Sequence, residues 1–248
     1  MILRLLDLFS GIGGFSYAAD QLVGGFETVA FVEREPFCQK VLNLNWPSVP
    51  IYPDVTTFTA EPGFCDVITA GFPCQDLSAA GKQAGLSGER SGLFYEVIRL
   101  AREIQPRFIV FENVANLVSH QGGATFQEVL FQIARAGFDA EWAVVSAKDV
   151  GACHLRKRIW IVAHANRSGP QRLGGECELE QCGGQESPPW RGGSCLSSDW
   201  RSYLSEPVLC RGDDGLSNRV DRLKALGNAV VPQCAAIPLR RVLELSRQ

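Results

Sequence analysis

The chain has 248 residues, of which 46% are hydrophobic and 21% charged, so it suits one α/β domain, or one large and one small domain. No stretch approaches the roughly 20 apolar residues of a membrane span, and the N-terminus is too soon interrupted by charge for a signal peptide, so we expect a soluble cytoplasmic protein. The net charge of −3 argues against nucleic acid, but residues 151–248 hold 14 Lys and Arg against 10 acidic residues, which suggests a polyanion partner unless the asymmetry is random scatter.

Nine cysteines without framework spacing predict reduced thiols in a cytosol. Four of them lie close together in sequence and are the candidates for a metal site: Cys177, Cys182, Cys195 and Cys210. Because no C-x-x-C pair occurs, we expect no metal.

The first elements are a strand, a glycine turn and a helix. Residues 3–9 form an apolar run that predicts a buried parallel strand, and residues 15–22 have helical character. Between them the spacing G-x-G-G lets the backbone approach a ligand at a helix N-terminus. This order is typical of a doubly wound nucleotide-binding fold, although a tight turn without a ligand is the alternative.

Acidic residues follow the next two predicted strands. Glu33 ends a strand over 28–32, about 20 residues past the glycines, where an acid is placed to bind ribose hydroxyls. After a predicted helix over 35–44, Asp54 and Val55 follow another short extended segment. Since ligands bind at the carboxyl ends of the strands, these residues are expected to line one crevice.

Cys74 follows a predicted strand over 66–70, on a turn made rigid by Pro73. A cysteine in that position is where a nucleophile is usually held toward a substrate, whereas a small buried hydrophobe is the alternative. The loop over 76–92 is long for an α/β domain and holds four glycines, as expected of an active-site lid.

The next elements are predicted as helices over 93–104 and 123–136 and strands over 107–111, 140–147 and 159–163. Glu112 ends the first of these strands, on the same sheet edge as Cys74. In an extended segment Arg156 and Arg158 point to one side, which indicates a phosphate or base site, or else a solvated edge. Residues 165–220 are rich in Gly, Pro, Ser, Cys and Trp. Regular structure is predicted again from Asp221 onward, with a last helix over 233–245.

Six short motifs follow one another along the chain, at spacings that suit a single α/β domain: residues 7–15 (DLFSGIGGF), 71–75 (GFPCQ), 81–83 (GKQ), 112–114 (ENV), 156–158 (R-x-R) and 227–230 (GN-x-V). This combination resembles the cytosine-5 DNA methyltransferases, most of all the small bacterial and phage-borne ones. The resemblance covers almost the whole chain except 165–220. It implies a doubly wound, mixed and mostly parallel Rossmann-like sheet for residues 1–164 plus 221–248, with 165–220 as a small irregular target-recognition region.

The resemblance also implies the catalytic roles. The thiolate of Cys74 would add to C6 of a cytosine flipped out of the duplex, which makes C5 nucleophilic enough to take a methyl group. Glu112 would share a proton with ring N3, and the Pro73 carbonyl would accept from the exocyclic amine. Arg158 would bind the cytosine O2, and Arg156 would support the loop and a phosphate.

S-adenosylmethionine is the implied cofactor. By resemblance Phe9 packs on adenine, Gly11 and Gly13 meet the amino-acid end, Glu33 holds the ribose, and Asp54 with Val55 reads the adenine edge. Asn228 and Val230 would close this pocket. The full cofactor-binding set on this reasoning is Asp7, Phe9, Gly11, Gly13, Gly14, Glu33, Asp54, Val55, Asn228 and Val230.

Double-stranded DNA is the implied partner, and a cognate restriction endonuclease is an optional one; we expect a monomer. The short region 165–220 predicts a recognition site of about four base pairs, because each base contact needs a positioned side chain. The candidate DNA contacts are Gln75, Ser78, Lys82, Arg167, Arg172, Arg191, Arg201 and Arg211. Each arginine alone is more often a phosphate or solvent contact than a base reader.

The segment before the two arginines departs from the usual family pattern Pro-Gln-x-Arg-x-Arg, because this chain has Cys153 and His154 at its first two positions. His154 stands where a glutamine is usual, so activity is predicted to acquire a pH dependence that a His154→Gln change would alter. Three rival functions remain: an RNA (tRNA) cytosine methyltransferase on the same scaffold, a non-catalytic DNA-binding protein, and a nicotinamide-dependent dehydrogenase. Intact Cys74 and Glu112 argue against the second, and G-x-G-G is not the dinucleotide fingerprint that the third needs.

Overall fold

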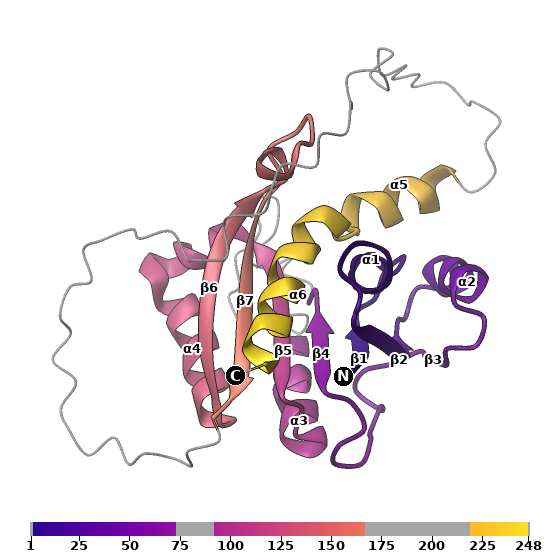
Figure 1. Cartoon of the computed structure of the whole chain (residues 1–248). Coiled ribbons are helices and arrows are strands. Elements are labelled where there is room, and N and C mark those ends of the chain that lie inside the picture. The colour runs from indigo at the N-terminus through magenta and orange to yellow at the C-terminus, as the bar shows by residue number, and fades with distance from the viewer. Residues whose placement is uncertain (1, 73–91, 167–218, 248) are drawn as a thin grey trace, which may run out of the picture.

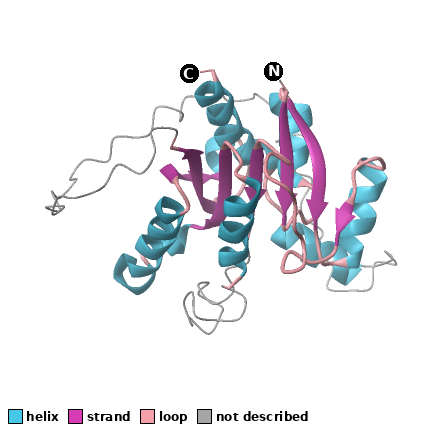
Figure 2. Ribbon diagram, turned by 90° about the horizontal axis from the view of Figure 1, so that it is seen from below, coloured by secondary structure: helices cyan, strands magenta, loops and turns pink. Residues whose placement is uncertain are grey.

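The computed structural model describes residues 2–72, 92–166 and 219–247, which form a sheet covered by helices on both faces (Figures 1 and 2). Its strands are β1 (Leu3–Leu8), β2 (Phe26–Val32), β3 (Ile51–Tyr52), β4 (Val67–Ala70), β5 (Phe108–Val114), β6 (Phe138–Ser146) and β7 (Lys157–Ala165). The strand order is β3-β2-β1-β4-β5-β7-β6. Neighbours from β3 to β5 pair in parallel, and β7 pairs antiparallel with both β5 and β6. The predicted doubly wound, mixed and mostly parallel sheet is confirmed.

Helices cover both faces of the sheet. They are α1 (Gly14–Tyr17), which continues as the π-helix η1 (Ala18–Val23), α2 (Pro36–Asn45), α3 (Leu93–Ile104), α4 (Ala124–Arg135), α5 (Arg219–Asn228) and α6 (Pro232–Ser246), with short 3₁₀ turns η3 (Ala115–Val118), η4 (His120–Gly123) and η5 (Ala147–Val150). Among these described helices none is both long and apolar enough to pass through a bilayer.

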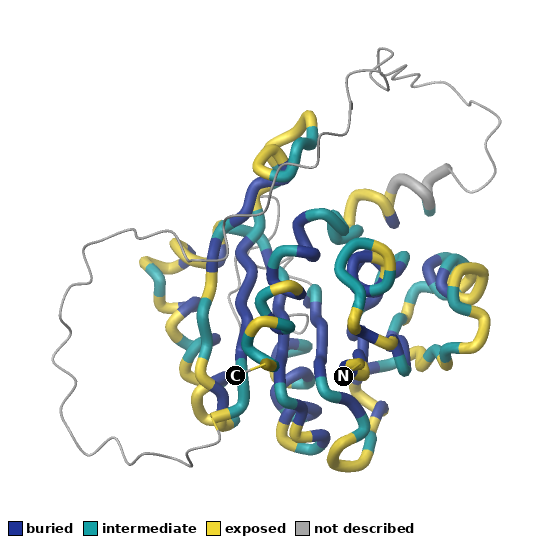
Figure 3. Tube along the Cα trace, in the orientation of Figure 1, coloured by how far each residue is buried: buried dark blue, intermediate teal, exposed yellow. Residues whose placement is uncertain are grey.

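Two hydrophobic cores lie on opposite faces of the sheet. One packs α3 and α4 against strand residues such as Leu6 and Leu8, and the other packs α1, η1 and α6 against Leu3 and Leu5. This division follows from the alternation of side chains along β1. Figure 3 shows the central strands buried along their length, as expected of parallel strands covered on both sides.

The sequence located most elements within a few residues, and α3 has the predicted bounds. Two differences matter for the site. β5 runs on to Val114 instead of stopping at Phe111, because residues 112–114 pair with β7. The helix α5 was not predicted at all, and it lies over the edge of the sheet where β1 ends (Figure 1).

The described cysteines carry free thiols: Cys38, Cys65, Cys153 and Cys234. The four cysteines weighed as metal ligands lie outside the described residues.

Candidate active site

A cavity of about 730 Å³ opens at the carboxyl edge of the parallel strands. It lies beside the junction of β1 and β4, the point at which the strand order reverses and where open α/β sheets bind ligands. Its walls come from the carboxyl ends of the five parallel strands, from the start of β7 and from α5. They include Phe9, Gly11, Glu33, Asp54, Val55, Gly71, Phe72, Glu112, Asn113, Arg156, Arg158, Lys224 and Asn228. Residues predicted for cofactor and for catalysis therefore share one cavity.

The glycine turn after β1 presents its backbone to this cavity. Phe9 has φ +54°, a left-handed conformation that bulky residues rarely adopt, and its side chain lines the cavity. Gly11 also has positive φ, and a Cβ added there would meet no atom within 4 Å. Strain of this kind persists where surrounding structure imposes it, most often at binding sites, which makes the turn a candidate for contact with a ligand.

Glu33 connects this turn to the end of β2. Its carboxylate accepts from the N–H of Gly11 at 2.7 Å and from the N–H of Glu35 at 2.7 Å. Burial raises the pKa of Glu33, and the backbone N–H groups offset part of that rise. A carboxylate has about four acceptor positions, so two amide bonds leave capacity for hydroxyl donors from the cavity.

Gly13 and Gly14, which the sequence analysis expects to contact the ligand, pack closely against other residues. A Cβ on Gly13 would come within 2.6 Å of the Trp46 ring, and one on Gly14 within 2.7 Å of the Val230 carbonyl oxygen. Neither glycine is among the residues that line the cavity, and Val230 supports the turn from behind. The glycines are required here because helix α1 approaches its neighbours so closely.

Asp7 is also not a ligand contact, contrary to the prediction. Its side chain is completely buried, and its carboxylate accepts from the hydroxyls of Ser16 at 3.0 Å and Thr69 at 2.8 Å. Burial raises its pKa to about 7. Asp7 therefore ties β1 to α1 and β4 below the glycine turn, and it lies outside the cavity lining.

Asp54 and Val55 form the wall opposite the glycine turn. The Asp54 carboxylate accepts from the backbone N–H of Thr56 at 2.9 Å and from its hydroxyl at 2.8 Å, which closes a tight turn. The backbone hydrogen bond of Thr56 is the main reason that the pKa of Asp54 is lowered. The second oxygen of the carboxylate is left for a donor in the cavity.

Glu112 and Arg158 form an ion pair at the opposite end of the cavity. Arg158 Nε lies 2.9 Å from Glu112 Oε1, and the glutamate side chain is only 13% exposed. Burial raises the pKa of Glu112, although the positive charges of Arg158 and Arg156 oppose the rise. A Cβ on Gly71 would lie 3.6 Å from Glu112 Oε2, so this carboxylate lies against the end of β4. Gly71 is three residues before Cys74 in the sequence.

Arg156 lines the cavity and donates to two main-chain carbonyls, while the phosphate contact predicted for it stays a prediction. Its Nη1 donates to the carbonyl of Gly227 at 2.9 Å and its Nη2 to the carbonyl of Ala229 at 2.8 Å. Burial is the main cause that lowers the pKa of Arg156, followed by the charge of Arg158. Arg156 thus holds the end of α5 and the residue after it beside the end of the cavity that contains Glu112.

Sequence reasoning gave no role to three features of the site. Asn113 donates from its side-chain amide to the Phe72 carbonyl at 3.3 Å. The Phe72 ring packs near Phe94, with ring centroids 5.3 Å apart, so two contacts fix Phe72. Asn113 belongs to the motif at residues 112–114, so the sequence singled out its position but could not show its hydrogen bond to Phe72.

The third feature is the ion pair from α5 to the cavity rim, in which Lys224 Nζ lies 2.7 Å from Glu35 Oε2. The run of residues 219–226 without Gly or Pro was the only sign of this helix. In the described ranges, no group of His, Cys, Asp and Glu side chains is arranged to hold a metal ion.

Several predicted site residues lie outside the described residues, and their roles stay predictions: Pro73, Cys74, Gln75, Ser78, Lys82, Arg167, Arg172, Arg191, Arg201 and Arg211. His154, the departure from the family pattern, is described and exposed.

Comparison with known proteins gives a consistent result. The family model described as "C-5 cytosine-specific DNA methylase" matches residues 3–186. The Type II methyltransferase M.HhaI of Haemophilus parahaemolyticus is 34% identical over 166 residues, which cover 66% of this chain and 50% of that protein. M.HpaII of Haemophilus parainfluenzae is 36% identical over 169 residues, 66% of this chain and 46% of that one.

Among solved structures, a candidate DNA modification methyltransferase encoded within a prophage (E. coli) superposes with a TM-score of 0.54 at 27% identity, covering 66% of this chain and 47% of that one. The matched part of this chain thus spans about half the length of its relatives.

Proposed function

This chain belongs to the C-5 cytosine-specific DNA methylase family, and from that premise we propose that it transfers a methyl group from S-adenosylmethionine to C5 of cytosine in duplex DNA. The observation that supports this most is the shared cavity. It joins a nucleoside-type site at Glu33 and Asp54 to a buried carboxylate, Glu112, which lies against Gly71. Gly71 is three residues before Cys74.

The residues of the cavity fit S-adenosylmethionine. The aromatic ring of Phe9 suits the face of a purine, and the free acceptor positions of Glu33 suit ribose hydroxyls. The open space beside Gly11 admits a backbone-bound amino-acid end. Asp54 keeps one carboxylate oxygen for an exocyclic amine. The bound cofactor would supply an electrophilic methyl group on its sulfonium.

The catalytic end of the cavity would activate the base. The Cys74 thiolate would add to C6 while Glu112 shares its proton with N3, so that the added electron pair reaches C5. After methyl transfer, loss of the C5 proton to a base would expel Cys74 and restore the aromatic ring. The raised pKa of Glu112 supports this role, because a carboxyl whose pKa is raised by burial keeps its proton more readily and can share it with the base. Arg158 would keep the carboxyl oriented and reach the O2 of the same base.

We propose that the remaining part of the chain supplies the DNA contacts. The relatives are Type II methyltransferases, which supports a role in DNA modification within a restriction-modification system. The target cytosine must leave the stack to reach a cavity of this depth. The proposed recognition region is 165–220, and its length favours a short recognition site.

A trapping experiment tests the proposal without knowledge of the recognition site. A long amplified duplex, prepared with 5-fluorocytosine in place of cytosine, contains every short sequence many times. With S-adenosylmethionine, the protein should form a denaturation-resistant adduct, because fluorine at C5 cannot leave as a proton does. The variant Cys74→Ser should form none, and mass spectrometry should place the modification on the peptide that contains residue 74.

Two other results would point to the rivals. An adduct with 5-fluorocytidine-substituted tRNA transcripts and none with duplex DNA would replace DNA by RNA as the substrate. Tight binding of duplex DNA with no adduct on either polymer, even though the protein binds the cofactor, would favour a non-catalytic DNA-binding protein.

A further inference from the structure

The wall of the cavity at Asp54 and Val55 receives little support from the sheet. β3 is only two residues long, Ile51–Tyr52, and the chain leaves the sheet directly after it. Internal bonds close the following turn: the Asp54 carboxylate accepts from Thr56, and its carbonyl accepts from the N–H of Phe58 at 3.1 Å. Such a turn has a defined shape, but these bonds do not fix its position relative to the rest of the site.

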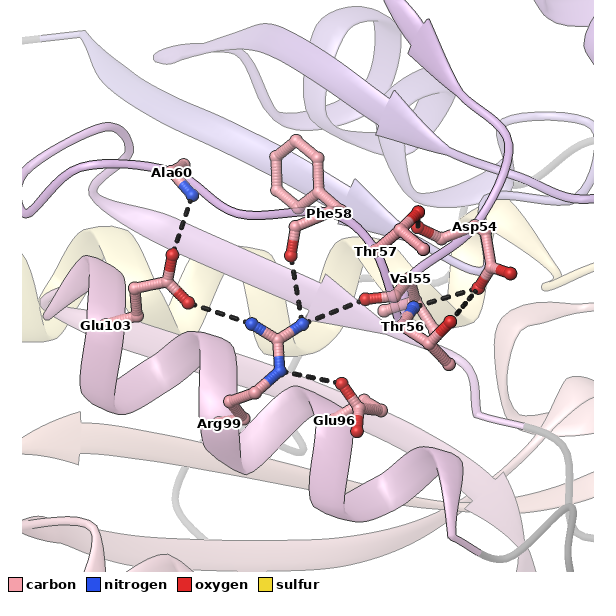
Figure 4. A network of polar contacts seen from close by, with 9 residues as sticks. All are labelled: Asp54, Val55, Thr56, Thr57, Phe58, Ala60, Glu96, Arg99 and Glu103. Atoms are coloured by element: carbon pink, nitrogen blue, oxygen red, sulfur yellow. Dashed lines mark hydrogen bonds and ion pairs between the residues drawn. The ribbon is translucent and has the colours of Figure 1, made fainter.

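Arg99 supplies that fixation from α3. Its Nη2 donates to the carbonyls of Val55 at 3.0 Å and Phe58 at 2.9 Å, so one nitrogen bridges both arms of the turn (Figure 4). Its Nε donates to Glu96 at 2.7 Å and its Nη1 to Glu103 at 2.8 Å. The planar guanidinium presents its donors in a fixed fork, so the two glutamates orient the group that holds the turn.

Glu103 makes a second connection to the same segment. While one of its oxygens pairs with Arg99, the other accepts from the backbone N–H of Ala60 at 3.0 Å (Figure 4). The residues 54–60, here called the wall segment, are therefore joined to α3 at three main-chain positions. Asp54, Val55 and Thr56 of this segment line the cavity, whereas Arg99 and Glu103 do not.

We propose that Arg99 is a positioning residue for the cofactor: without touching it, Arg99 holds the wall segment where that segment binds the purine end of S-adenosylmethionine. This inference rests on the proposed function. The side chain of Arg99 is 34% exposed, and exposed ion pairs contribute little to global stability. Its main effect is accordingly on the local position of the two carbonyls. A neutral side chain in its place would leave the wall segment intact as a turn but free to shift.

Three variants test this. Arg99→Ala removes every donor, Arg99→Lys keeps the charge but loses the fork, and Arg102→Ala removes an exposed arginine one turn along the same helix as the matched control. Calorimetry would measure the Kd of S-adenosylmethionine and of its demethylated product, and thermal unfolding would monitor the fold. The methyl-transfer assay would give kcat and the KM for each substrate.

Arg99→Ala should raise the Kd and the KM of the cofactor about tenfold. This factor corresponds to the binding free energy that one good hydrogen bond contributes. Its kcat at saturating cofactor and its KM for DNA should stay within about twofold, Arg99→Lys should be intermediate, and Arg102→Ala should match the wild type. This split separates positioning from a general structural role, which would lower kcat and the unfolding temperature together.

Two results would overturn the inference. One is unchanged cofactor affinity in Arg99→Ala; the other is a loss of affinity accompanied by an equal loss of kcat and of unfolding temperature. If Arg99→Ala does not fold, Arg99→Lys decides, since wild-type affinity in that variant would remove the need for a fork. Failure of the proposed function has a different signature, namely that the wild-type protein itself binds no S-adenosylmethionine.

Discussion

Replacing Asp7 by asparagine should stabilise the protein above neutral pH. The Asp7 carboxyl is completely buried, and burial raises its pKa from 3.8 to about 7, against the lowering effect of hydrogen bonds from Thr69 and Ser16. The nearby charge of Glu33 adds to the rise. An asparagine is neutral at every pH, and its amide can accept from one hydroxyl and donate to the other.

The magnitude follows from the two pKa values. The unfolded chain ionises this group near pH 3.8, whereas the folded protein keeps it protonated up to about pH 7. Its contribution to stability is therefore complete below the unfolded pKa and is lost as the pH rises through the folded pKa. A difference of about three units at 1.36 kcal/mol each gives a total of about 4 kcal/mol, of which about 2–3 kcal/mol is lost between pH 5 and pH 8.

Urea unfolding at several pH values between 5 and 8 would measure this for the wild type and for Asp7→Asn. The free energy of unfolding of the variant, relative to the wild type, should rise by about 2–3 kcal/mol across that range. Asp139→Asn, which removes an exposed carboxylate from β6, controls for the change in net charge. A difference between Asp7→Asn and the wild type that does not vary with pH would show that Asp7 is ionised in the folded protein and would refute the reasoning.

Three further changes probe the catalytic end of the cavity. Glu112→Gln keeps the hydrogen bonding but has no acidic proton to share, so single-turnover methylation at saturating cofactor should slow by about 10² to 10⁴-fold. Asn113→Ala removes the donor to the Phe72 carbonyl. In a quenched time course with 5-fluorocytosine DNA, the rate of adduct formation at Cys74 should fall by about tenfold, while the affinity for the cofactor stays unchanged. Arg156→Ala leaves the two carbonyls of the α5–α6 connection without their charged donor, which should cost about 1–3 kcal/mol of unfolding free energy in urea and also weaken cofactor binding in calorimetry.

The regular elements of the fold were predictable because their signals are local. Helix α3 begins and ends at the predicted residues, since its apolar residues recur at helical spacing and form one buried face. β1 was equally clear as a nearly continuous apolar run, which is how a strand buried on both faces is encoded. In both cases the pattern that determines the element lies within the element.

The roles of the glycines and of Asp7 were not predictable in the same way. A glycine that makes room for a ligand and one that makes room for a neighbouring side chain have the same local sequence. Trp46 and Val230 decide between these alternatives for Gly13 and Gly14, and they lie far along the chain. Likewise, an aspartate at a strand end indicates a ligand contact unless Ser16 and Thr69 are known to pair with it.

Helix α5 escaped prediction for a physical reason. Its sequence, RVDRLKALGN, is rich in charged residues and carries no wide apolar stripe, so hydrophobic periodicity does not reveal it. Tertiary contacts hold it at the site, among them the ion pair of Lys224 with Glu35. A helix that is stabilised mainly by contacts with the residues around a cavity can be recognised only once those residues are known to lie together.

The antiparallel direction of β7 explains how the arginines reach Glu112. In a purely parallel sheet the carboxyl edge receives only strand ends, and the start of a neighbouring strand would lie at the opposite edge. Because β7 runs against β5, its first residues lie at the carboxyl edge, with Arg158 opposite Val114 and Trp160 opposite Glu112. Arg158 is therefore a diagonal neighbour of Glu112 on the same face, within reach of its carboxylate. The reversal of one strand thus brings a cationic segment to the edge where the acidic residues of the parallel strands gather.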